Sequence, residues 1–242
     1  MKKLLFIPLL IGIVLNFNSC NVGEGRNEVR VEPTYAIVDN NPNTLGGILL
    51  GTSYGYFSAL SSVDFFPGDC FYMRFTVDFD KQPASSDFMV VSDIEKIAVN
   101  KTTVEEANSV DIGNHTFKIS KFNLYPNPYF HGKVFLEFES NNQIQDLRLV
   151  YNTEEEDEAG VKNLYLLASA ASSNTSSYIV RHAFDINNLF NNNSRDTTIY
   201  EGGMTFDLRY IKANINYISD MKEDGEPNYT KFEKPFEIFI FK

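Results

Sequence analysis

The sequence predicts an all-β protein, because short runs that alternate apolar and polar residues recur along the chain and turn residues separate them. Within 71–80 each odd position is apolar and each even position is polar or amphipathic, which is the period of two that a half-buried strand requires. The same alternation recurs over 133–139 and 204–210, and the last residues, 236–241, form another strand. Strands at this spacing are typical of sandwiches and barrels.

The chain begins with the features of a secretory signal. Two lysines precede an uncharged, mostly apolar run over 4–15, which Ser19 and Cys20 follow. A basic start, a short apolar core and a small residue before the cut predict a lipoprotein signal peptide at 1–19, and the cysteine after the cut predicts lipidation of Cys20. The apolar run is shorter than a membrane-spanning helix requires, so we expect the lipid to hold the protein at the membrane.

A second interpretation is an ordinary secretory signal that is cut near Ser19, with Cys20 incidental. Asn16 and Phe17 favour it, since small and aliphatic residues are usual before a lipidated cysteine. Under the first interpretation we expect a cell-envelope lipoprotein of the outer membrane, with neither membrane face favoured. Residues 20–32 are polar and have little to bury, so they predict a flexible tether.

The net charge restricts the classes of partner that the protein can bind, and the cysteine content restricts how its fold can be stabilised. The chain carries 21 Lys and Arg residues against 32 Asp and Glu residues, a formal net charge of −11. So acidic a chain lacks the basic surface that neutralises phosphates, and nucleic acid is therefore not an expected partner. Cys70 is the second of only two cysteines, so an acylated chain forms no intramolecular disulfide and depends on buried cores.

Two cores are expected in the mature chain, whose length is sufficient for them. Phe75 and Phe206 each lie in an alternating run, and we expect them to be buried in separate domains. Residues 94–99 follow a capping-box spacing and are interpreted either as a helix or, preferably, as a strand. The irregular stretch 102–111 places the domain junction near residue 105.

Four segments, taken in order, resemble a known family. They are Pro-Gly-Asp-Cys-Phe-Tyr-Met-Arg-Phe at 67–75, an apolar segment ending in Asn-Lys at 94–101, Tyr-Leu-Leu at 165–167 and Arg-His-Ala-Phe-Asp at 181–185. In this order and spacing the chain is similar to the NigD-like lipoproteins of Bacteroidetes, although the usual pattern near Tyr165 is only partly kept. The resemblance implies an N-terminal OB-like β-barrel, assigned to 33–104, and a C-terminal immunoglobulin-like β-sandwich, assigned to 105–242. It also implies a bacteriocin-associated or host-interaction setting, without an established biochemical role.

No motif predicts catalysis, a metal centre or a cofactor. Residues 51–55 match the G-x-S-x-G pattern of a nucleophile elbow at Ser53, but that elbow needs a strand before it and a helix after it in a parallel sheet. A Ca²⁺ site made by Asp78, Asp80 and Asp87 is the alternative to carboxylates that are simply solvated. We therefore expect a protein that is not an enzyme and holds neither a cofactor nor a metal.

The three histidines, His115, His131 and His182, lie far apart in the sequence. None forms a close pair with another histidine or a cysteine, so no zinc spacing can be drawn from them. We expect each to be a surface or hydrogen-bonded residue.

Tyr125 and Tyr129 are the candidates for ligand contact. They flank Pro126-Asn127-Pro128, and the prolines stiffen this loop, which lowers the cost of ordering it on binding. Sugar sites present exposed aromatic faces, so these rings favour a glycan. The alternative is that they pack at the domain junction.

Together these observations predict an exported, lipid-anchored binding or structural module that contacts the membrane through its lipid and binds an envelope protein or a glycan. The alternatives are a glycan-binding surface lipoprotein, a fimbrial subunit and a serine hydrolase that uses Ser53. An exposed aromatic platform would favour the first, and an open sheet groove would favour the second. A deep polar pocket with Ser53 or paired carboxylates at its base would favour the third.

Overall fold

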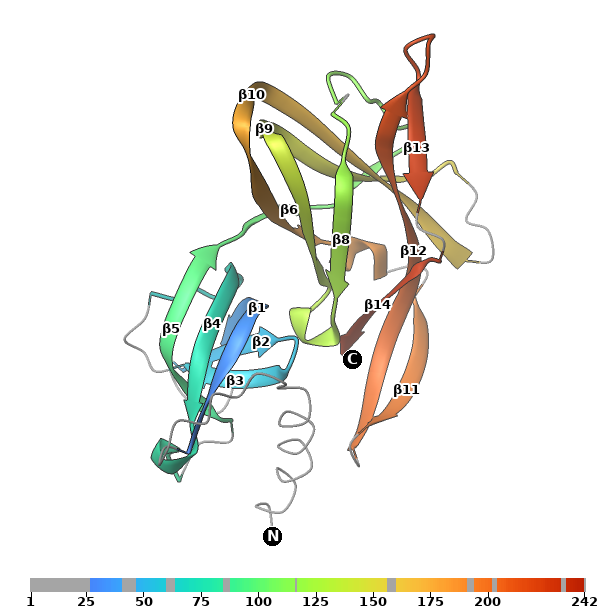
Figure 1. Cartoon of the computed structure of the whole chain (residues 1–242). Coiled ribbons are helices and arrows are strands. Elements are labelled where there is room, and N and C mark those ends of the chain that lie inside the picture. The colour runs from blue at the N-terminus through green and yellow to red at the C-terminus, as the bar shows by residue number, and fades with distance from the viewer. Residues whose placement is uncertain are drawn as a thin grey trace. The chain divides into compact units, whose positions relative to one another are not determined.

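The computed structural model describes residues 27–40, 47–59, 64–84, 88–115, 117–155, 160–190, 194–201, 204–231 and 234–241, and most of them are in strands (Figure 1). The all-β prediction is therefore confirmed. The chain divides into two compact units, the first drawn from 1–99 and 198–207, the second from 100–197 and 208–242. Within the described ranges no helix has the length and apolar character to span a membrane. The predicted signal peptide and Cys20 lie outside those ranges.

The first unit is a closed barrel of five strands in the order β1-β2-β3-β5-β4. The elements are β1 (Glu28–Asn40), β2 (Ile48–Thr52), β3 (Gly55–Ala59), β4 (Cys70–Asp78), the 3-10 turn η2 (Phe79–Lys81) and β5 (Val90–Ala98). Neighbouring strands are antiparallel except β3 and β5, whose short parallel pairing closes the barrel. Five closed strands match the OB-like barrel that was expected, and the segment with a helical alternative is the strand β5.

Alternation along β4 fills this barrel. Its odd positions from Phe71 to Val77 are buried in one core, where the ring of Phe75 lies 5.0 Å from that of Phe57. Phe75 is fully buried, as predicted. Because aromatic side chains are large, a few of them are sufficient to fill the interior of a barrel made of five short strands.

The barrel begins earlier than the predicted start at residue 33. β1 starts at Glu28, and Val31 within the expected tether is buried and pairs with Phe75 of β4. Val29 and Val31 alternate with Glu28, Arg30 and Glu32, which is the period of two of a half-buried strand, so the sequence carried a sign of this strand that the tether interpretation overlooked. Residues 28–32 are thus part of the folded unit.

The second unit is built on a large sheet. The elements of the sheet and its connections are β6 (Asn100–Thr103), β7 (Glu105–Ala107), β8 (Ser120–Pro126), η3 (Pro128–Phe130), β9 (Lys133–Asn152), β10 (Val161–Asp185), η5 (Asn187–Leu189), β11 (Arg195–Glu201), β12 (Met204–Met221), β13 (Pro227–Lys231) and β14 (Phe236–Phe241). Residues 198–207, from β11 and the start of β12, group with the first unit. The strand order is β11-β12-β10-β9-β7, with β6 on β10, β8 on β9, and β13 and β14 on β12.

β9 and β10 form a long antiparallel ribbon, seen side by side in Figure 1. Register shifts between Ser169 and Tyr178 interrupt the pairing midway. Leu136 of the first half of β9 and Leu149 of the second half belong to the same buried core, so the ribbon folds over and supplies two strands to each layer. The expected β-sandwich is therefore confirmed, and its layers share strands.

β10 also has parallel partners along its other edge. Residues 161–166 pair with β12, and residues 182–185 pair with β6. The stretch 102–111, predicted to be irregular, thus contains the end of β6 and all of β7, because short edge strands take their order from the long strands beside them. Phe206 was expected in the second core, but it is only partly buried and lies in the part of β12 that groups with the first unit.

Candidate functional site

The aromatic loop between β8 and β9 holds the two predicted contact residues. Tyr125 ends β8 with 38% of its surface exposed, opposite Phe135 of β9. Tyr129 lies in η3, and its ring packs 5.2 Å from the ring of Phe241 at the chain's end. Tyr125 is thus presented to solvent, whereas Tyr129 is partly buried by a neighbour. Their role in ligand contact stays a prediction.

Hydrogen bonds hold the same loop in one conformation. Asn127 accepts from the backbone N–H of Tyr129 at 2.9 Å and caps η3. Gly132 then adopts φ +73°, and a Cβ there would lie 2.2 Å from Oδ1 of Asn187. The amide of Asn187 donates to the carbonyl of His131 at 2.9 Å. His131 therefore belongs to a structural turn, consistent with the expected hydrogen-bonded residue.

Ser53 lies in a tight β-hairpin, which is not the geometry of a nucleophile elbow. Residues 53 and 54 form the turn between β2 and β3, so a strand rather than a helix follows the serine. The hydroxyl of Thr52 donates to the carbonyl of Gly55 at 3.0 Å, and the hydroxyl of Thr34 donates to Ser53 at 3.1 Å. The motif is thus accounted for by turn formation.

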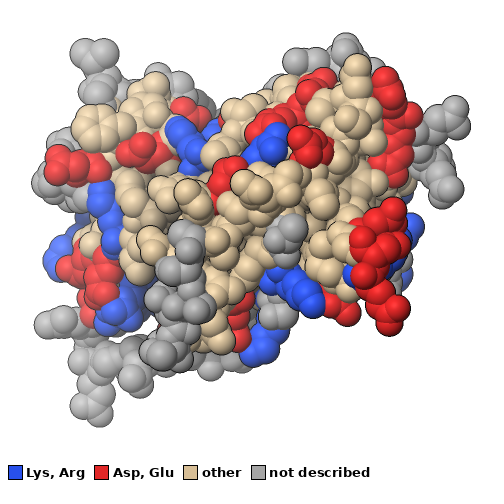
Figure 2. Space-filling model, turned by 90° about the horizontal axis from the view of Figure 1, so that it is seen from above, with Lys and Arg blue, Asp and Glu red and all other residues tan. Residues whose placement is uncertain are grey.

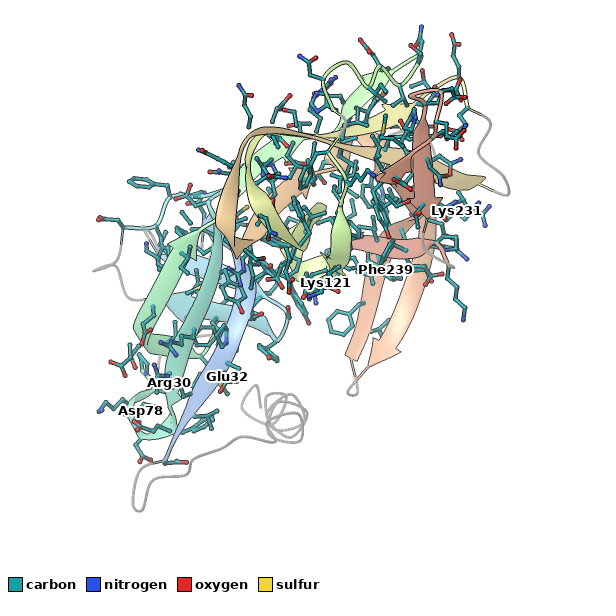
Figure 3. All side chains as sticks on the ribbon, turned by 45° about the horizontal axis from the view of Figure 1, so that its top comes forward. Arg30, Glu32, Asp78, Lys121, Lys231 and Phe239 are labelled. Atoms are coloured by element: carbon teal, nitrogen blue, oxygen red, sulfur yellow. The ribbon has the colours of Figure 1, made fainter. Side chains whose placement is uncertain are left out.

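Asp78, one of the three candidate Ca²⁺ ligands, caps the 3-10 turn η2. Asp78 lies at the end of β4 (Figure 3), where it accepts from the backbone N–H of Asp80 at 3.1 Å and pairs with Lys81 at 2.7 Å. The hydrogen bond from Lys81 lowers the pKa of Asp78. Asp87 is outside the described residues, and within them no group of His, Cys, Asp and Glu side chains could hold a metal ion.

His182 is a structural residue of β10. Its Nε2 lies 3.0 Å from the hydroxyl of Thr102 on β6, and its ring lies 4.7 Å from that of Phe184. Burial lowers its pKa to about 4, so the imidazole is neutral at physiological pH.

An open polar pocket of about 660 Å³ lies in the second unit. It is lined by the turn 111–115 and by residues of β9 and β10 that pair on one side of the ribbon's bend, Asp146, Arg148 and Ser169 among them. His115 is buried in its wall, and its Nε2 lies 3.3 Å from Oδ2 of Asp146. The sequence offered no way to find this site, because the three segments are far apart in the chain and contain no shared motif.

An ion pair borders the pocket. Arg148 donates from Nε and Nη2 to the two carboxylate oxygens of Glu105 on β7, at 2.9 and 2.5 Å. These bonds lower the pKa of Glu105 and raise that of the Arg148 guanidinium. Acidic residues prevail more widely, and Figure 2 shows Asp and Glu gathered in clusters with Lys and Arg between them.

The fold defines a two-part β protein, an OB-like barrel followed by a β-sandwich. No known protein-family profile matches the sequence, and no curated protein sequence matches it. Among solved structures, an uncharacterized protein from Parabacteroides merdae covers 87% of this chain and 97% of its own at 16% identity, with a TM-score of 0.55. A protein of unknown function, DUF1344, from Bacteroides vulgatus covers 86% and 92% at 14% identity, with a TM-score of 0.50.

A NigD-like immunity protein from Bacteroides caccae is also similar, covering 86% of this chain and 96% of its own at 9% identity, with a TM-score of 0.49. A NigD-like protein is thus among the structures that this chain is similar to. At these identities the likeness concerns the fold. The two-part architecture implied by the sequence resemblance is the one observed.

Proposed function

We propose that this protein is an exported, lipid-anchored component of the cell envelope, reaching the outer membrane, that acts by binding a partner and not by catalysis. Cys20, directly after the small residue Ser19 that follows the apolar run, carries the proposal. β1 begins at Glu28, so the chain between lipid and barrel spans at most about 30 Å. Stiff loops on a rigid β scaffold support binding, because such scaffolds position contact residues at low cost.

The anchor is tested by Cys20→Ser. This variant should lose labelling by a lipid probe and leave the membrane fraction. Cys70→Ser is the matched control, since Cys70 is buried in the barrel and should not affect anchoring. Lipid labelling that persists in Cys20→Ser would contradict the anchor.

The binding role is tested by crosslinking the protein in its native envelope and identifying what is purified with it. We expect one partner protein or glycan to be enriched, and a Tyr125→Ala, Tyr129→Ala double variant to weaken that enrichment. Recovery of bacteriocin components would support the setting implied by the resemblance. Labelling of Ser53 or Ser169 by a serine-hydrolase probe would contradict a role limited to binding.

A further inference from the structure

The strand β10 has a stretch of open edge at residues 177–181. One edge of β10 pairs with β9, without a register shift from Tyr178 to Asp185. On the opposite edge, β12 pairs only with residues 161–166, and β6 pairs only with residues 182–185. Among the residues that the structure describes, no strand therefore pairs with residues 177–181 on this second edge.

The backbone of Ile179 points to the open edge. The carbonyl of Asp185 accepts from the N–H of Val104, directly after β6, at 2.9 Å, whereas the N–H of Ile186 donates to Gly132, directly before β9, at 3.0 Å. Backbone groups of successive residues point to opposite edges of a strand, so the odd-numbered residues from 179 to 185 face the β6 side. The N–H and the carbonyl of Ile179 thus offer a donor and an acceptor to a further strand.

The side chains of this stretch are apolar and exposed. Among the described residues of the second unit, three large hydrophobic side chains are exposed, and two of them are the neighbours Tyr178, at 37%, and Ile179, at 47%. Neighbouring side chains lie on opposite faces of a sheet, so an added strand would cover part of both. Exposed apolar side chains beside an unpaired edge are the combination on which strand addition depends.

Side-chain hydrogen bonds hold the open stretch in its extended form. The hydroxyl of Tyr178 donates to the carbonyl of Asn142 and accepts from the N–H of Ile144 at 3.2 Å, both on β9. Arg181, two residues after Ile179, donates to Glu137 at 2.9 Å. The edge is therefore formed before any partner arrives, which reduces the entropy lost on binding.

We propose that β10 binds an extended peptide segment of a partner protein, which adds as a strand along residues 177–181 and exchanges backbone hydrogen bonds with Ile179. The main chain of the segment supplies the donor and the acceptor, and its side chains cover those of Tyr178 and Ile179. The inference rests on the proposed binding function and describes how the partner is held.

The charges beside the open edge favour an uncharged segment. Arg181 is paired with Glu137, and Glu139, which lies opposite Ile179 on β9, is paired with Lys121 at 2.7 Å. Each charge is thus already balanced by a neighbour, so a charged residue of the segment would gain little attraction there.

A second copy of this chain is less suited to the open edge than a peptide is. Antiparallel pairing of two copies about Ile179 would bring residues 173–176 of one copy beside residues 182–185 of the other, where β6 already occupies the edge. Two copies could therefore pair over residues 177–181 only, which is short for an interface that must bury about 1,200 Å² or more. A peptide ends where β6 begins and does not have to pass it.

Binding of a synthetic peptide to the purified full-length protein tests the proposal. The probe is a fluorescent nonapeptide in which threonine and valine alternate, and the control is the same peptide with its backbone nitrogens methylated. Fluorescence anisotropy should show the control binding at least about tenfold more weakly, because it keeps the side chains but cannot donate to the edge. Hydrogen exchange measured by mass spectrometry should show the amide of Ile179 slowed at least about tenfold by saturating probe.

Two proline variants locate the edge. Ile179→Pro removes an N–H that points away from β9, so the melting temperature should be kept while the affinity for the probe falls at least about tenfold. Glu223→Pro is the matched control, because Glu223 is the second residue of an exposed turn in which Gly225 donates to Lys222, a position that favours proline. It should leave the affinity within about twofold.

Ile179→Thr separates the backbone from the side chain. It keeps the N–H and the branched Cβ but reduces the apolar surface, so the affinity should fall by no more than about fivefold. This variant and the methylated peptide test the proposal even where Ile179→Pro does not fold.

Three outcomes would overturn the proposal: no binding of the probe, equal binding of the methylated control, or unchanged affinity in a folded Ile179→Pro variant. Protection of the Ile179 amide that rises with protein concentration in the absence of probe would also overturn it, since a second copy would then occupy the edge. The lipid-labelling and crosslinking experiments would stand in each case, because they detect the anchor and a partner wherever that partner binds.

Discussion

The barrel and the sandwich bury different kinds of polar side chain. In the barrel the buried polar residues are threonines, namely Thr34, Thr52 and Thr76. In the sandwich they are His115, Ser140, Lys162 and Asn216. Threonine hydroxyls are satisfied locally by the backbone, as Thr52 shows by donating to Gly55. Histidine and lysine side chains, by contrast, can carry a charge, and their surroundings decide how readily they do so.

Lys162 illustrates what the sandwich accommodates. Its ammonium donates to the hydroxyl of Tyr151 at 3.2 Å and lies 4.3 Å from the centre of that ring. A buried cation is costly unless such partners surround it. The difference between the units teaches that the barrel buries only small hydroxyl side chains beside its apolar core, whereas the sandwich also buries side chains that can carry charge.

Truncation of a core ring has the largest expected effect and tests whether the two cores are separate. Phe75→Ala in the barrel and Phe138→Ala in the sandwich should each lower the free energy of unfolding by about 3–5 kcal/mol, because both rings are fully buried. Denaturant titration combined with limited proteolysis should show each loss confined to one unit, with early cleavage near 102–111 or 154–158. A single transition that both variants shift equally would indicate one cooperative core.

Acid should destabilise the sandwich through His182. Burial lowers its pKa from 6.5 to about 4, so as the pH falls the unfolded chain takes up this proton before the folded chain does. Stability is therefore lost as the pH falls from about 6.5 to about 4, by up to about 3 kcal/mol. The first unit contains no histidine.

Denaturation of the wild type and of His182→Gln across this pH range isolates the contribution. The variant should show a flatter pH dependence, because the carboxylates that also titrate there are common to both proteins. Identical slopes would mean that the imidazole is not desolvated in solution.

Ion pairs allow a further comparison of the two units, with smaller expected effects on the free energy of unfolding. In the sandwich, Arg181 donates to Glu137 at 2.9 Å, and the Glu137 side chain is 20% exposed. In the barrel, Glu95 bridges Arg30 and Arg74 but is 53% exposed. Glu137→Gln should cost about 1–3 kcal/mol and Glu95→Gln less than about 1 kcal/mol, as denaturant titration would measure. The reverse order would show that burial does not govern these pairs.

Ser53→Ala should have the smallest effect. Ser53 is exposed in its hairpin and accepts one hydrogen bond, from Thr34, so its loss should change stability by no more than about 0.5 kcal/mol. We expect crosslinking to recover the same partner from this variant as from the wild type. A lost partner or a lost hydrolytic activity would assign this hairpin a role that its geometry does not suggest.

Strand alternation predicted much of the fold. The buried positions of β4 and the terminal strand β14 follow directly from their sequence patterns. Successive side chains of a strand point to opposite faces, so the apolar positions alone indicate which face is buried. The start of β1 also alternates, over 28–32, but was assigned to the tether because this stretch is mostly polar, and the short strand β7 shows no such pattern. Val31 is ordered by Phe75, and β7 pairs with β9 through residues more than forty positions away.

The sequence patterns predicted less of the pocket than of the fold. Asp146 lies opposite Ser169 only because of the register of β9 and β10, and a one-residue slip would turn one of them to the other face. His115 reaches them from a separate turn. A lone histidine in a sequence carries no sign of the carboxylate that it will meet, whereas Tyr125 and Tyr129 could be proposed because proline and aromatic residues stand together in the chain.

The ribbon of β9 and β10 also sets the order in which this chain can fold. Its two strands are joined by a short connection and can pair early, but the parallel partners of β10 must come from β6 before the ribbon and from β12 after it. Contacts between remote segments form slowly, since a long loop must close before they gain stability. Until both partners arrive, one whole edge of β10 offers unpaired backbone groups to any neighbouring chain. Aggregation of molecules that are still folding would therefore begin at this edge, in the interval before β6 and β12 cover their parts of it.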